Sequence, residues 1–200
     1  MTFDPIELIT KVAAPVIQAM AVVVTAVYAS KGLKAWRQQM IGKRRIEVAE
    51  EALVAAYKAR ANLNFVRSPF GFAREGGSRR PEEGETASDT ERLNRAFAPL
   101  ERIQKCNDDL AEISKIAVLV QVHFGAEEAE HFKVIIQSFN KVAIAATMLM
   151  ETGEDRDAET RGDKRTWRAT IYAHGNDTIT REVEEAITKI EDLCRRHLKD

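Results

Sequence analysis

Cysteine, glycine and strand-like alternation are scarce in this chain. Among 200 residues there are two cysteines and ten glycines, and no run alternates apolar and polar residues for long enough to suggest a sheet. The thiols of Cys106 and Cys194 have no C-x-x-C or histidine-rich spacing beside them, so neither a disulfide framework nor a zinc site is expected. We interpret them as small buried or half-buried thiols in a reducing compartment, with a redox role as the alternative. Helix formers dominate, and the sequence predicts an all-α protein.

Recognisable catalytic motifs are missing as well. The chain holds no G-x-x-x-x-G-K, G-x-G-x-x-G, G-x-S-x-G or H-E-x-x-H sequence. We therefore expect no cofactor and no enzyme, although a Cys–His nucleophile would leave no mark of this kind. A deep polar pocket with convergent titratable groups would favour an enzyme again.

A single Glu-x-x-His motif runs from Glu128 to His131. On a helix this spacing places a carboxylate and an imidazole on one face, and di-iron bundles use it twice, together with further glutamates. Because no second copy exists, we expect a solvated helix N-terminus, where acidic side chains favour the helix dipole, and no metal site.

The small net charge of −1 hides an asymmetry between the two ends of the chain. Residues 1–45 carry seven Lys or Arg against two acids, whereas residues 46–200 carry 23 against 29. A net-acidic C-terminal part argues against nucleic-acid binding, because that affinity depends on clustered cations that neutralise phosphates. The basic N-terminal part needs a different explanation.

A charge-free run of nineteen residues extends from Val12 to Ser30. As a helix it would measure about 28 Å, just long enough to cross the hydrocarbon layer of a membrane. The run is rich in alanine and contains Gln18 and Thr25, so a buried helix of a soluble domain is one alternative. A cleaved signal peptide is another, but acids precede the run and cations follow it, which opposes export. The sequence predicts a transmembrane anchor over residues 1–30.

The cations that follow the anchor indicate its orientation. The positive-inside bias places residues 31–200 in the cytoplasm, as expected for a single-pass protein of the cell inner membrane. The same side chains would contact anionic lipid head groups, with an aromatic ring at the interface. These residues are Lys31, Lys34, Trp36, Arg37, Lys43, Arg44 and Arg45.

Small and weakly polar residues recur along one face of the predicted anchor. Such residues let two transmembrane backbones approach closely, so the face predicts self-association or contact with a partner helix. The alternative is a chance pattern in an alanine-rich segment. The face comprises Ala14, Gln18, Ala21, Thr25, Ala29 and Gly32.

Amphipathic periodicity predicts the rest of the fold. A basic juxtamembrane region and first long helix occupy residues 31–67, and a flexible, glycine-rich loop follows at 68–88. In that loop Arg79, Arg80 and two phenylalanines form either a docking motif or a disordered connector. The S-x-x-E sequence at Ser88 predicts a cap for a long helix, bent near Pro99, that ends at Gly125.

Two more helices complete the predicted domain, one over residues 126–150 and one from residue 176 onward. Residues 151–177 between them read as a charged loop, with Trp167 and Tyr172 packed against the bundle. Four soluble helices with apolar faces predict an elongated helical bundle or hairpin behind the transmembrane helix.

The stretch 31–70 resembles uncharacterised bacterial single-pass membrane proteins with a cytoplasmic helical domain. The resemblance covers about a fifth of the chain and implies the anchor and the helix placement, but no activity. The matching residues are Trp36, Arg37, Tyr57, Arg60, Arg67, Pro69 and Phe70.

The leading hypothesis from the sequence is therefore a membrane-anchored cytoplasmic helical module that binds or scaffolds another protein. A homo-oligomeric membrane effector or small channel component is the alternative, supported by Gln18 and Thr25 within the anchor.

Overall fold

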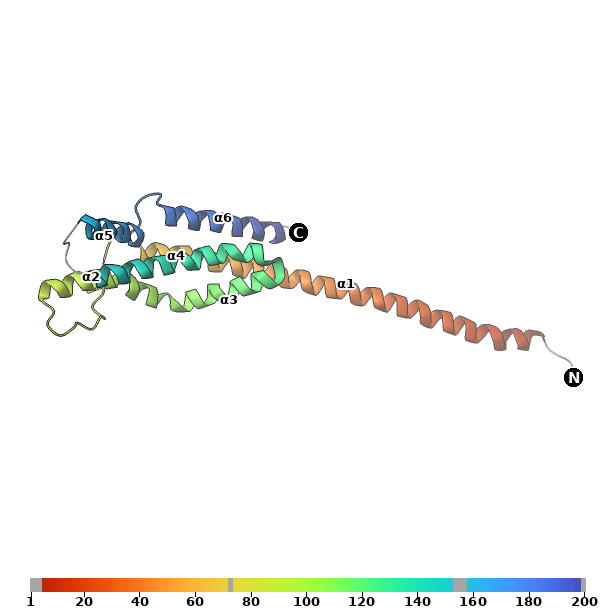
Figure 1. Ribbon diagram of the computed structural model, residues 1–200. Coiled ribbons are helices and arrows are strands. Elements are labelled where there is room, and N and C mark those ends of the chain that lie inside the picture. The colour runs from red at the N-terminus through yellow and green to blue at the C-terminus, as the bar shows by residue number, and fades with distance from the viewer. Residues whose placement is uncertain (1–4, 72–73, 153–157, 199–200) are drawn as a thin grey trace. The chain divides into compact units, whose positions relative to one another are not determined.

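The computed structural model of this protein is helical throughout the part of the chain that it describes. It describes residues 5–71, 74–152 and 158–198, and places the side chains of all these residues except 5–15 and 158. Six helices and no strand occur there, which confirms the all-α prediction (Figure 1). The helices are α1 (Pro5–Val66), α2 (Ala87–Lys105), α3 (Asn107–Phe124), α4 (Ala126–Glu151), α5 (Ala158–Ile171) and α6 (Thr178–Leu198).

The chain divides into two compact units, an N-terminal unit (Met1–Arg45) and a C-terminal unit (Ile46–Asp200). Of the N-terminal unit, the structure describes helix only, the first part of α1. Every described apolar side chain from Val16 to Val27 other than alanine is at least 47% exposed. An 18-residue window of this helix has a mean hydropathy of 1.5, and none of it is buried. The helix is therefore long and apolar enough to span a membrane.

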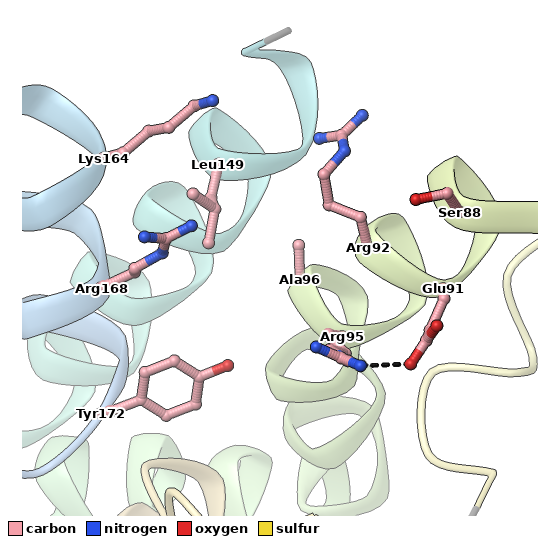
Figure 2. A pocket seen from close by; sticks show the side chains of 9 residues that line it. All are labelled: Ser88, Glu91, Arg92, Arg95, Ala96, Leu149, Lys164, Arg168 and Tyr172. Atoms are coloured by element: carbon pink, nitrogen blue, oxygen red, sulfur yellow. Dashed lines mark hydrogen bonds and ion pairs between the residues drawn. The ribbon is translucent and has the colours of Figure 1, made fainter. Parts of the chain in front are cut away.

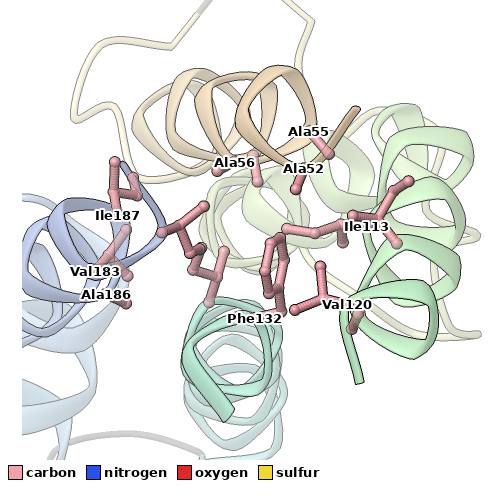
Figure 3. Close-up of a cluster of buried hydrophobic side chains, with 14 of the residues drawn as sticks. Ala52, Ala55, Ala56, Ile113, Val120, Phe132, Val183, Ala186 and Ile187 are labelled. Atoms are coloured by element: carbon pink, nitrogen blue, oxygen red, sulfur yellow. The ribbon is translucent and has the colours of Figure 1, made fainter. Parts of the chain in front are cut away.

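The main core of the C-terminal unit is shared by four helical segments. The part of α1 from Val48 onward contributes mostly alanines, and α3, α4 and α6 contribute larger aliphatic side chains. Figure 3 shows the alanines of α1 facing Phe132 of α4, which is fully buried. Small residues on one helix let its neighbours pack close to its backbone, so the alanine face of α1 suits a central position in this core.

Helix α4 is also long and apolar enough to span a membrane, but its apolar residues are partly buried in the protein. Its most apolar window has a mean hydropathy of 1.2 and is 44% buried. Phe132, Ile135 and Phe139 all lie in the main core. The hydropathy of α4 therefore reflects a core helix, which distinguishes it from the exposed apolar part of α1.

A second, smaller apolar cluster lies at the far end of α4. It joins Ala96 of α2, Leu149 of α4 and Ile171 of α5, with Trp167 and Tyr172 packed against it. The prediction that the two aromatic residues pack against the helices is confirmed.

Helix α5 corrects the sequence-based prediction of a charged loop at 151–177. Residues 158–171 are helical, although the segment is rich in charge and contains Gly162. Ile171 is fully buried and Trp167 is partly buried in the second cluster. Tertiary packing of this one face stabilises a helix that local propensity did not predict.

The predicted helix from Ser88 to Gly125 is wrong in two details. Its cap is Thr86, whose hydroxyl accepts a hydrogen bond from the backbone N–H of Asp89 at 3.1 Å and donates one to the Asp89 carboxylate at 2.6 Å. The helix also ends at Lys105, and α3 begins after Cys106. Pro99 lies inside α2 and does not end it. In the described part of the chain, one helix, α1, therefore contains both the predicted anchor and the first long helix, two helices replace the predicted helix from Ser88, and α5 is additional.

The loop between α1 and α2 was predicted correctly as non-helical, but several side chains hold its described residues in place. Gly76 has a φ of +78°, and a Cβ there would lie 1.9 Å from the Asn94 backbone oxygen. The Gly76 N–H donates to Glu101 at 2.8 Å, and Arg79 forms an ion pair with Glu85 at 2.5 Å. The hydrogen bond from Arg79 lowers the pKa of Glu85 to about 2. The first contact joins the turn to α2 and the second lies within the loop, and the flexibility expected of residues 68–88 stays a prediction.

Candidate functional site

The predicted association face of the anchor lies on α1. Gln18, Ala21, Thr25, Ala29 and Gly32 are all exposed helical residues. A Cβ added at Gly32 would meet no atom within 4 Å. The side chain of Ala14 lies outside those that the structure describes. The described part of the face is therefore open to a second helix.

Thr25, one of the polar residues of this face, forms its hydrogen bond within its own helix. The Thr25 hydroxyl donates to the Ala21 carbonyl of its own helix at 2.8 Å. Such a bond satisfies a hydroxyl within one turn and needs no partner from outside. Thr25 can therefore lie in a lipid environment without a neighbouring polar group.

The predicted lipid-contact residues follow the apolar segment on the same helix. Lys31, Lys34, Trp36, Arg37, Lys43 and Arg45 are exposed, and Arg44 is half-buried. Trp36 is 57% exposed. An exposed indole next to exposed cations is the arrangement expected at a membrane–water interface.

A buried arginine, Arg102 of α2, organises the end of α1. Its guanidinium forms an ion pair with Glu75 at 2.5 Å, and the two side chains are 3% and 9% exposed. It also donates to carbonyls at the end of α1 and in the following loop, including those of Ser68 at 2.7 Å and Phe70 at 2.9 Å. The last carbonyls of a helix have no partner within it, so Arg102 caps α1.

Arg67 performs a similar task at the junction of α1, α5 and α6. It is 2% exposed and donates to the Thr170 carbonyl at 3.1 Å and to the Asp177 carboxylate at 3.0 Å. Burial raises the pKa of Asp177, but hydrogen bonds from Arg67 and from the N–H groups of Thr180 and His174 outweigh this effect and lower it to about 2. Arg67 and Arg102 therefore stabilise the fold through contacts with carboxylates and backbone carbonyls.

A cavity of about 390 Å³ opens between α2, the end of α4 and α5. Figure 2 shows Arg92 and Arg95 on α2, and Lys164, Arg168 and Tyr172 on the opposite side. The floor is apolar, because Ala96 and Leu149 belong to the second apolar cluster. Ser88 and Glu91 complete the lining.

The cations of this cavity differ in how they are paired. Arg95 forms an ion pair with Glu91, and Arg92 lies 3.7 Å from Asp89 on the same helix. Both pairs are exposed, so each contributes little to stability. Lys164 is only 6% exposed. No carboxylate among the described residues forms an ion pair with Arg168, and the described lining residues include four cations and one carboxylate.

A second hollow lies along the basic side of α5. It has a volume of about 780 Å³ and shares Lys164, Arg168 and Tyr172 with the first cavity. Arg161 and Arg165 add two more exposed cations. One short helix therefore carries positive charge into two adjoining hollows.

The remaining candidate groups from the sequence are Glu128 of the Glu-x-x-His motif and the two cysteines. Glu128 forms an ion pair with Arg196 of α6 at 3.0 Å. In the part of the chain that the structure describes, no three His, Cys, Asp or Glu side chains are grouped closely enough to hold a metal. Both cysteines are free and buried, and burial raises the pKa of Cys194 to about 11. The interpretation of both as buried thiols is confirmed.

Comparison of the chain with protein families, with curated proteins and with solved structures found no match.

Sequence reasoning missed the basic cavity because its cations come from segments about 70 residues apart. The available signal was the spacing of Arg161, Lys164, Arg165 and Arg168, which places four cations on adjacent turns if the segment is helical. Reading this segment as a loop removed that signal.

Proposed function

We propose that this protein is a membrane-anchored helical module that binds or scaffolds another protein on the cytoplasmic side of the cell inner membrane. The observation that carries the proposal is the contrast within α1. Its apolar residues from Val16 to Val27 are exposed, whereas from Val48 onward its alanines are buried in the main core. Exposed apolar side chains in a continuous stretch are costly in water and favourable in lipid.

The orientation follows from the cations. The six Lys and Arg residues between residue 31 and residue 45, together with their neighbour Trp36, lie on the C-terminal side of the apolar stretch. Cations next to a span favour the cytoplasmic side, so the C-terminal unit is placed in the cytoplasm in this proposal.

The absence of catalytic motifs supports binding as the role of the C-terminal unit. Among the described residues, no observation specifically favours an oligomeric membrane effector or small channel component. Thr25, one of the two residues behind that alternative, donates its hydroxyl to its own helix.

Two measurements test the anchor and its orientation. The full chain should stay in the membrane fraction after alkaline carbonate extraction, and a chain that lacks residues 1–30 should be released. A C-terminal fusion to a reporter that works only outside the cytoplasm should be inactive, and a fusion to a cytoplasmic reporter should be active. Release of the full chain would refute the anchor, and activity of the first reporter would refute the orientation.

The binding role is tested by purifying the full chain in mild detergent and identifying the proteins that co-purify with it. The control is a variant of the anchor face, Ala21→Leu, which separates partners held by the anchor from those held by the C-terminal unit. If no protein is enriched over a control membrane protein, the scaffold proposal fails.

A further inference from the structure

We propose that the cavity between α2 and α5 binds a small molecule that carries phosphate groups. This site goes beyond the proposed scaffold function and does not depend on it. Its walls hold Arg92 and Arg95 on one side and Lys164 and Arg168 on the other, so four cations face a single space (Figure 2). Glu91 is the only acidic side chain among the described residues of the lining, and it is paired with Arg95.

The charge of the cavity favours an anion. Cations that face each other across a cleft repel one another, and low-dielectric walls focus their field into the space between them. The described carboxylates neutralise this field only in part, because Arg168 forms no ion pair with any of them. A bound polyanion would offset the charge of Arg168 and reduce the repulsion among the lining cations.

The geometry favours phosphate over a single carboxylate. Guanidinium groups present planar pairs of N–H donors that match two oxygens of one phosphate. Arg92 and Arg95 approach from α2 while Arg168 approaches from α5, and the Tyr172 hydroxyl points into the same space (Figure 2). Donors on opposite walls suit a ligand with phosphate oxygens on two sides, such as a diphosphate.

The size of the cavity suits a small ligand. A volume of about 390 Å³ lies at the lower end of the range of small-molecule sites. The apolar floor formed by Ala96 and Leu149 accommodates a short carbon skeleton beneath the cations. A phosphorylated metabolite therefore fits within this cavity, whereas an acidic protein segment would have to extend into the adjoining hollow along α5, and competition by oligoglutamate tests that outcome.

Inorganic pyrophosphate is a suitable probe. Titration calorimetry on the full chain in mild detergent should show binding of one pyrophosphate per chain, and added salt should weaken it. Arg168→Gln should weaken the affinity about tenfold or more, because it removes a charge-assisted contact. Arg168→Lys should have an intermediate affinity, because it keeps the charge and loses the paired donors.

Two further variants separate this site from general electrostatic attraction. Arg92→Gln, on the facing helix, should weaken binding as Arg168→Gln does. Arg181→Gln removes an exposed cation of α6 that lies 4.0 Å from Glu185, and should leave the affinity unchanged. Since Arg168 and Arg181 are both exposed, neither change should impair folding, and thermal unfolding checks this.

The phosphate could belong to a soluble molecule or to a lipid head group. Repeating the titration in phosphatidylcholine nanodiscs, with and without phosphatidic acid, distinguishes the two. If phosphatidic acid competes with pyrophosphate in the wild type but not in Arg168→Gln, the cavity binds a lipid head group. If phosphatidic acid does not compete, the cavity binds a soluble phosphate compound. The proposal is overturned if pyrophosphate does not bind, if Arg168→Gln binds as well as the wild type, if Arg181→Gln loses as much affinity, or if oligoglutamate competes as well as pyrophosphate.

Discussion

Replacement of Arg102 by methionine should destabilise the C-terminal unit more than most single substitutions. The Arg102 side chain is 3% exposed, and its guanidinium pairs with Glu75 at 2.5 Å. It also supplies donors to the carbonyls of Ser68 and Phe70. Methionine fills much of the volume but leaves the buried Glu75 carboxylate without this counter-ion. Removing one partner of a buried pair costs about 3–5 kcal/mol, a large share of the 5–15 kcal/mol typical of whole domains.

Urea unfolding of the full chain in mild detergent measures this loss. Trp167 packs against the second apolar cluster and reports on the C-terminal unit. A Trp36→Phe background removes the fluorescence of the other tryptophan of the chain. With slopes of about 1–3 kcal/mol per molar urea, the midpoint should fall by about 1 M or more while the slope stays constant.

Arg95→Met is the matched control, because it removes an arginine of the same helix. Arg95 is 75% exposed and pairs with a 67% exposed Glu91. An exposed pair contributes little, so this variant should lie within about 0.5 kcal/mol of the wild type. A loss below about 1 kcal/mol in Arg102→Met, or equal losses in the two variants, would refute the role assigned to the buried pair.

Three further predictions concern other parts of the chain. Asp177→Asn should lower the free energy of unfolding at pH 7. The difference from the wild type should shrink as the pH falls from the ordinary carboxyl pKa of 3.8 toward about 2, because the pKa of Asp177 is lower in the folded state than in the unfolded state. Equal differences in urea titrations at pH 7 and at about pH 2 would contradict this prediction. Thr86→Ala should cost about 0.5–2 kcal/mol in the same assay and Ser88→Ala about 0.5 kcal/mol or less, and the reverse order would restore Ser88 as the cap. Ala21→Leu should weaken association in a membrane-based dimerisation assay, because a contact between two helices there contributes only about a few kcal/mol, whereas Val23→Leu should not weaken it. If both variants associate as strongly as the wild type does, this face is not an interface.

Hydrophobic patterning alone was sufficient for the long elements. The charge-free run from Val12 to Ser30 and the periodic apolar residues of α4 and α6 identified helices whose type the structure confirms. Apolar periodicity is a local property of the chain, and when it extends over many turns it identifies a helix even where the exact end residues are not predicted. The exposure of the apolar part of α1 also distinguishes it from α4, a difference that hydropathy does not reveal.

Tertiary structure decided the features that depend on residues far apart in the chain. Arg67 and Arg102 became buried caps because the ends of α1, α2 and α5 meet, and no local pattern marks them as different from surface arginines. Helix α5 forms because Ile171 and Trp167 have an apolar cluster to pack against. Only once that helix is in place do Lys164 and Arg168 face Arg92 and Arg95 across one cavity. The amino-acid sequence determines the apolar periodicity of each helix. The contacts between helices are stabilised by the burial of apolar surface, which depends on the tertiary structure.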